Sequence, residues 1–196
     1  SKAAYTLANL PKSGNLWDLA RRKGLTYRSY GEYTTRSSDN TKMEAIAGVG
    51  ALVGHVSPKF KLLGMRDTDN VKVFIEEFDQ YEKNYDSKDP DKRLPNFVVM
   101  SLPENHTHGT RPGSYTPSAM VANNDYAVGM LVDRVTHSKY WADTAIFIVE
   151  DDAQDGSDHV DARRTVALAI SPYTKRGTVD STLYTTSGML RTIELL

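Results

Sequence analysis

Hydrophobic and polar positions along the chain predict four short strands, each bounded by glycine, proline or charged residues. The predicted strands cover residues 25–30, 96–102, 145–149 and 165–170. The last three are almost wholly apolar, which is typical of strands that are buried on both faces of a sheet.

Between these runs, apolar residues recur every third or fourth position, as on the buried face of a helix. This periodicity predicts helices over residues 15–23, 69–84 and 117–135, and from 186 or 187 onward. Thr116 is placed to cap the third helix, and Asp67 or Asp69 the second. Helices alternating with strands predict an α/β fold, a three-layer α/β/α sandwich around a mostly parallel sheet.

Composition limits the classes of function. A chain of 196 residues suits one α/β domain over residues 1–196, and its formal charge of −1 gives no reason to expect nucleic acid as a partner. No apolar run approaches the roughly 18 residues of a membrane span. Cysteine is absent, which excludes disulfides, thiolate nucleophiles and Cys-bound zinc.

The predicted strand 145–149 is followed at once by a dense group of acids. Six carboxylates lie within twelve residues: Glu150, Asp151, Asp152, Asp155, Asp158 and Asp161. Their mutual repulsion favours a bound cation, and ligands in α/β sheets bind at the carboxyl ends of strands. A solvated acidic loop is the alternative. An EF-hand calcium loop is excluded because Ala153 and Ala162 occupy two positions at which oxygen ligands are required.

A second polar cluster, Glu104, His106 and His108, follows the predicted strand 96–102. Two imidazoles beside a carboxylate suit a metal or phosphate site, although surface loops also hold such triplets by chance. Asn123 and Asn124, early in the third helix, are explained equally well by capping or by a local hydrogen-bond network.

Two stretches together resemble phosphoesterases of the alkaline phosphatase superfamily, in the branch that includes phospholipases C and acid phosphatases. Leu102-Pro-Glu-Asn-His-Thr-His-Gly-Thr110 is similar to their Leu-Pro-Asn-Asp-His-Thr-x-Gly-Thr segment. Glu150-Asp-Asp-Ala-Gln-Asp-Gly-Ser-Asp-His-Val160 is similar to their later acidic motif, in which a carboxylate pair precedes Asp-His-Val.

The resemblance implies hydrolysis of a phosphate ester, assisted by a divalent metal ion. By position, Asp151 and Asp152 would be metal ligands, and His106 and His159 would be catalytic residues that bind metal or contact phosphate. The ion could be zinc, manganese, magnesium or calcium. Relatives are frequently exported, so the resemblance also implies an extracytoplasmic protein, either periplasmic or secreted.

The chain departs from the family pattern at two places. Glu104-Asn105 replaces the usual Asn-Asp, so a carboxylate has moved or been lost. Arg163 stands where the family often has histidine, and arginine cannot ligate a metal, although it can hold a phosphate. A non-catalytic metal- or ligand-binding domain is therefore an alternative function, and a third is action on sulfate esters or phosphate transfer.

The family's Ser or Thr nucleophile lies upstream of the part that resembles this chain. We therefore expect residues 1–196 to be the C-terminal part of a larger phosphoesterase domain. The purified chain should hydrolyse neither aryl phosphate nor aryl sulfate above the rate of a buffer control, with or without added divalent metal. Robust turnover of aryl phosphate by residues 1–196 would contradict this expectation.

Overall fold

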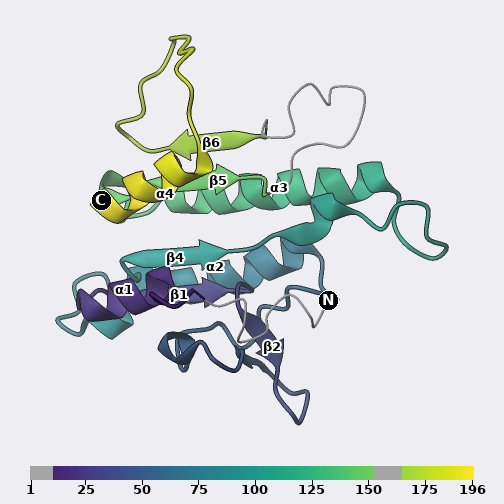
Figure 1. The fold of residues 1–196 in the computed structure, drawn as a ribbon, viewed down its shortest axis with the longest axis horizontal. Helices are drawn as coiled ribbons and strands as arrows, with labels where there is room; N and C mark the ends of the chain where they lie inside the picture. Colours follow the sequence, from purple (N-terminus) through teal and green to yellow (C-terminus); the bar gives the residue numbers. More distant parts are fainter. Residues whose placement is uncertain (1–10, 152–164) are drawn as a thin grey trace. The chain divides into compact units, whose positions relative to one another are not determined.

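The structure is a computed structural model that describes residues 11–151 and 165–196 (Figure 1). The chain divides into two compact units, residues 1–138 and 139–196. The prediction that both belong to one α/β domain stays a prediction.

Residues 11–138 of the first unit form four strands and three α-helices, joined by short 3-10 turns. In chain order they are α1 (Leu16–Arg22), β1 (Tyr27–Tyr30), β2 (Thr34–Arg36), β3 (Met43–Ala45), η2 (Gly50–Leu52), α2 (Asp67–Lys83), η3 (Pro90–Lys92), β4 (Phe97–Met100), η4 (Pro103–His106) and α3 (Pro117–Thr136). The predicted helices 15–23 and 117–135 are confirmed within one or two residues.

Strands β1 and β4 form a parallel pair, with Tyr27 opposite Phe97 and Tyr30 opposite Met100. Parallel strands need a long crossover between them, and α2 lies in this connection. The parallel pairing that the alternation of helices and strands predicted is confirmed for these two strands.

Residues of β1 contribute to two different apolar clusters. Tyr27 belongs to a buried cluster that includes Trp17 of α1 and Leu52 of η2. Tyr30 is fully buried and packs edge-on against Phe74 of α2, with ring centroids 5.2 Å apart. Because β1 joins both clusters, α1 and α2 are each anchored on the same strand.

A single carboxylate, Glu77 of α2, binds three side chains from the strand region. Its Oε2 accepts hydrogen bonds from Arg28 Nε at 2.6 Å and from the Tyr30 hydroxyl at 2.9 Å. Its Oε1 accepts from Ser57 Oγ at 2.6 Å. Burial and the negative charge of Glu77 raise the pKa of Tyr30, which keeps the phenol protonated as a donor.

Helix α3 is joined to α2 by charge and aromatic contacts. Arg134 of α3 forms ion pairs with Asp79 and Glu82 of α2, at 2.7 and 2.5 Å. Its guanidinium also lies 4.8 Å from the ring centroid of Phe78. These contacts fix the C-terminal half of α3 on α2.

Two local features of the first unit differ from the predictions. The sequence predicted no strand between residues 30 and 96, but β2 and β3 lie in this interval and pair as an antiparallel hairpin. These strands are short and mostly polar, so they lack the apolar run that indicates a strand. The N-cap position of α2 is occupied by Arg66, whose side chain makes no capping bond, and not by Asp67 or Asp69. Asp67 is the first helical residue, and its side chain accepts from the backbone of Glu104.

The second unit contains η5 (Trp141–Asp143), β5 (Ile146–Val149), β6 (Ala167–Ile170) and α4 (Thr186–Leu195). Strands β5 and β6 pair antiparallel, with Ile146 opposite Ile170, so the prediction of parallel pairing does not hold here. The prediction that β6 is buried is also wrong, since Leu168 keeps 45% of its surface exposed. An apolar run predicts a strand, but burial depends on what packs against it.

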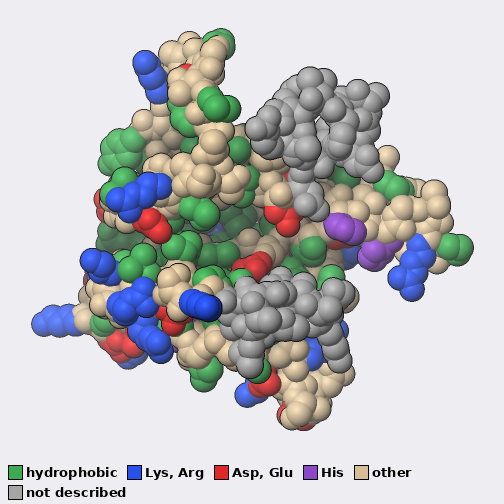
Figure 2. Space-filling view, in the orientation of Figure 1, with side chains coloured by type: hydrophobic (Ala, Val, Ile, Leu, Met, Phe, Trp, Pro, Cys, Tyr) green, Lys and Arg blue, Asp and Glu red, His purple; other side chains and the backbone are tan. Residues whose placement is uncertain are grey.

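The segment between β6 and α4 exposes several large hydrophobic side chains, namely Tyr173, Val179, Leu183 and Tyr184. Figure 2 shows hydrophobic side chains reaching the surface on this loop. No helix among the described residues is both long and apolar enough to cross a membrane.

Phe78 provides a direct test of the contact between α2 and α3. It is fully buried, so Phe78→Ala should lower the free energy of unfolding by about 3–5 kcal/mol. The control is Glu76→Ala on the exposed side of α2, whose stability should change by less than about 0.5 kcal/mol. Urea denaturation followed by circular dichroism measures both, and equal effects would show that Phe78 is not a core residue.

Candidate functional site

The carboxyl ends of β1 and β4 lie at one edge of the parallel pair, where α/β proteins bind ligands. Glu32 follows β1 and Ser101 follows β4, and Ser101 Oγ donates a 2.7 Å hydrogen bond to Glu32 Oε2. The chain turns after β1 at Gly31, whose φ of +95° suits glycine. A Cβ at Gly31 would also lie 3.0 Å from the ring of Phe60.

The η4 turn, directly after β4, points its two titratable side chains in different directions. Glu104 is buried, with 7% of its surface exposed, whereas His106 is exposed. His108 is exposed as well. The turn thus separates an inward carboxylate from outward imidazoles, so the predicted cluster of Glu104 with the two histidines does not form one set of ligands.

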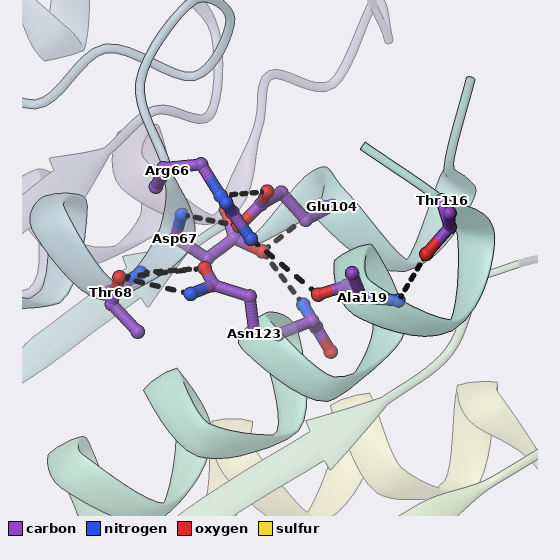
Figure 3. Close-up of polar contacts among 8 residues, drawn as sticks. Arg66, Asp67, Thr68, Glu104, Thr116, Ala119 and Asn123 are labelled. Atoms are coloured by element: carbon purple, nitrogen blue, oxygen red, sulfur yellow. Dashed lines mark hydrogen bonds and ion pairs between the residues drawn. The ribbon is translucent and has the colours of Figure 1, made fainter. Parts of the chain in front are cut away.

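Glu104 is held by Asp67, the first residue of α2, through two reciprocal hydrogen bonds (Figure 3). The backbone N–H of Asp67 donates to Glu104 Oε2 at 2.8 Å. The backbone N–H of Glu104 donates to Asp67 Oδ2 at 2.9 Å. Each carboxylate therefore binds the other residue's main chain, and the helix start and the turn are fixed to one another.

Arg66 supplies the positive charge beside these two carboxylates. Its Nε lies 2.5 Å from Glu104 Oε1. Its guanidinium stacks 4.0 Å from the ring centroid of Tyr115, and its Nη2 lies 3.5 Å from the carbonyl oxygen of Ala119 (Figure 3). One arginine thus connects the η4 turn with the start of α3.

Two asparagines of α3 complete the network. Asn124 Nδ2 donates to Asp67 Oδ2 at 2.9 Å and to the Leu102 carbonyl oxygen at 2.8 Å. Asn123 binds Thr68, accepting from its N–H at 3.3 Å and donating to its hydroxyl at 3.1 Å. Of the two roles that the sequence left open for these asparagines, the hydrogen-bond network is the one observed.

The carboxyl group of Asp67 is in an unfavourable environment for a charge. The side chain is fully buried, and its Oδ1 has no hydrogen-bond partner in the part of the chain that the structure describes. Burial raises the pKa of Asp67, while the bonds from Asn124 and from the Glu104 N–H act in the opposite direction.

The residue after the turn, Thr107, has a strained backbone, with φ of +57° and ψ of 178°. A non-glycine residue in this region costs on the order of 1–3 kcal/mol. Its N–H donates to the Glu104 carbonyl oxygen at 2.9 Å, so the strained conformation is tied to the residue that Asp67 holds.

The structure places the predicted site residues only in part. His106 lies exposed on the η4 turn, and Asp151 lies exposed just beyond β5 in the second unit. Asp152 and His159 lie outside the described residues. Within residues 11–151 and 165–196 there is no group of three or more His, Asp or Glu side chains that could hold a metal ion. The grouping of His106 with the acidic segment stays a prediction.

Asp67 was predicted only as a possible helix cap, and Arg66 was not predicted at all, because neither residue follows a strand. The sequence feature that could have indicated this network is Asp67 itself, an acid just before an apolar helical pattern. An acid at this position is normally interpreted as a helix cap. Its actual partner is 37 positions away, and a separation of that kind has no local signature.

Three comparisons relate the chain to known proteins. A sequence model of the phosphoesterase family matches residues 6–196. A search among curated proteins finds no match. Among solved structures, one match is a protein in the alkaline phosphatase superfamily from Vibrio parahaemolyticus, 18% identical, with a TM-score of 0.49. The alignment covers 85% of this chain and 44% of that protein, so the chain spans less than half of that structure's length.

The raised pKa of Asp67 predicts a dependence of stability on pH. The folded state binds this proton more tightly than the unfolded state, whose pKa is near 3.8, so folding loses stability as pH rises between the two values. Asp67→Asn lacks this titration. The free energy of unfolding of the variant, relative to wild type, should therefore increase with pH above 3.8 and then level off.

Urea denaturation at a series of pH values measures this difference. The matched control is Asp69→Asn, in the same helical turn, whose carboxylate is exposed and pairs with Lys72. If the Asp67→Asn difference were independent of pH, the carboxyl group would not be perturbed by burial.

Proposed function

The chain belongs to the phosphoesterase family, and from that premise we propose that it provides part of the active site of a metal-dependent phosphate-ester hydrolase. The observation that carries the proposal is the family match, which extends from residue 6 to residue 196. We further propose that the parallel pair β1–β4 is part of a three-layer α/β/α sandwich, because α1 and α2 both pack against residues of β1.

The proposed site uses residues at the carboxyl ends of two strands. His106 follows β4 and Asp151 follows β5, and both side chains are exposed, so each is accessible to a bound group. Asp151 and Asp152 would hold a zinc, manganese, magnesium or calcium ion, with His106 and His159 binding metal or phosphate. A divalent ion bound there would stabilise charge on the phosphate oxygens.

The residues of this chain would orient the substrate rather than attack it. An exposed imidazole at His106 can donate a hydrogen bond to a phosphate oxygen when its ring is protonated or in the matching tautomer. The nucleophile, a Ser or Thr, is proposed to lie upstream in the longer domain. An extracytoplasmic location is also proposed, on family resemblance alone.

A second function is favoured by one observation. Glu104, the carboxylate that stands in place of the family's usual pattern, is turned inward and paired with Arg66. The Glu104 carboxylate therefore stabilises the protein's own structure. It does not supply the oxygen ligand that the family pattern would provide to a metal ion. In this case the chain would be a non-catalytic ligand-binding domain that keeps the phosphoesterase fold but does not hydrolyse phosphate esters.

Calorimetric titration separates these two functions. The phosphoesterase proposal predicts that the chain binds zinc, manganese or calcium, and that Asp151→Asn weakens binding by at least about tenfold, because a hard carboxylate ligand is lost. The matched control is Asp143→Asn, an exposed acid just before β5, which should leave binding unchanged. Absence of binding to all three ions, or equal effects of the two variants, would favour the non-catalytic domain.

A further inference from the structure

We propose that Asp67 is a positioning residue for His106 and acts through the main chain of Glu104. This inference rests on the proposed function, because it gives His106 its role. Asp67 does not touch the imidazole. It holds the turn on which His106 stands, so that the imidazole leaves the end of β4 in one fixed direction.

The bond pattern supports this role. The Asp67 N–H and side chain both bind Glu104, and Glu104 lies within the same 3-10 turn as His106. Asn124 also ties Asp67 to the Leu102 carbonyl, one residue before the turn begins. The turn is therefore held at its entrance and at its centre, while its last residue faces solvent.

The energetics argue against a role in stability alone. Glu104 and Asp67 are both buried; Arg66 forms its ion pair with Glu104, and Asp67 Oδ1 has no hydrogen-bond partner among the described residues. Replacing such buried ionic groups with apolar residues is often neutral or stabilising. A group that is unfavourable for folding is expected where it fixes a functional geometry.

The strained backbone of Thr107 is an independent observation. It directly follows His106, and its N–H binds the carbonyl oxygen of Glu104. Strained residues persist only where the surrounding structure determines their conformation. Releasing Glu104 from Asp67 removes that constraint, so the backbone at Thr107 should relax and His106 should change direction.

The test is nuclear magnetic resonance on the full chain, without ligand. Asp67→Ala should shift the imidazole signals of His106, assigned with His106→Gln, and should speed exchange of the Thr107 amide about tenfold, as for the loss of one hydrogen bond to a charged group. Asp67→Asn keeps an oxygen acceptor, so in this variant the His106 signals and the Thr107 exchange rate should be close to those of the wild type. Asp69→Ala, in the same turn of α2, should change neither.

If Asp67→Ala does not fold, Asn124→Ala provides the same test, because it removes one of the two donors to Asp67 Oδ2. It should shift both signals in the same direction by a smaller amount. A variant that unfolds more easily but keeps the wild-type signals of His106 and Thr107 would overturn the proposal, since Asp67 would then be structural only. Failure of Asp67→Asn to restore the signals would also overturn it.

A second titration distinguishes this inference from the proposed function. Zinc and then inorganic phosphate are added to the wild-type chain while the His106 signals are followed. A His106 that responds to Asp67→Ala but to neither zinc nor phosphate would support the positioning role and contradict the phosphoesterase proposal. If the His106 signals respond to zinc or phosphate but not to Asp67→Ala, the phosphoesterase proposal is supported and the positioning role of Asp67 is contradicted.

Discussion

The first unit depends on how it places charge inside the protein. Burying a carboxylate is unfavourable unless donors surround it, and α2 carries two such groups. The partly buried Glu77 has donors on both oxygens, whereas the buried Asp67 has donors on Oδ2 only among the described residues. Glu77 is surrounded by Arg28, Tyr30 and Ser57, and Asp67 is bound by Glu104 and Asn124. Because each carboxylate demands specific donors, these contacts allow only one register of α2 against the strands, whereas apolar packing alone would tolerate several.

The apolar core and the polar contacts have different roles: the core drives packing, and the polar contacts set orientation. Phe74 and Phe78 of α2 provide the buried surface that drives packing, since both are almost fully covered. Hydrophobic contact has little directionality, so it cannot by itself orient the turn after β4. The hydrogen bonds of Asp67 and Glu104 have fixed lengths and angles and provide that orientation.

The sequence predicted the elements with strong periodicity and missed those that depend on distant partners. The helix over residues 117–135 was readable because its cap, its proline and its apolar face all agree. The β2–β3 hairpin was not, because polar strands resemble loops. The buried role of Glu104 was also hidden, since its partner in α2 precedes it by 37 residues. His106 and Asp151 were correctly predicted to follow strands, whereas their grouping depends on tertiary contacts that a one-dimensional pattern does not encode.

The antiparallel pair of the second unit has a consequence for handling the protein. Each of its strands is paired on one side only among the described residues, and Val166 and Leu168 are exposed. Unpaired backbone groups beside apolar side chains form a template on which another chain can add a strand. Self-association through β6 is thus expected at high protein concentration. Natural sheets often carry lysine on such edge strands, so Leu168→Lys should reduce this self-association.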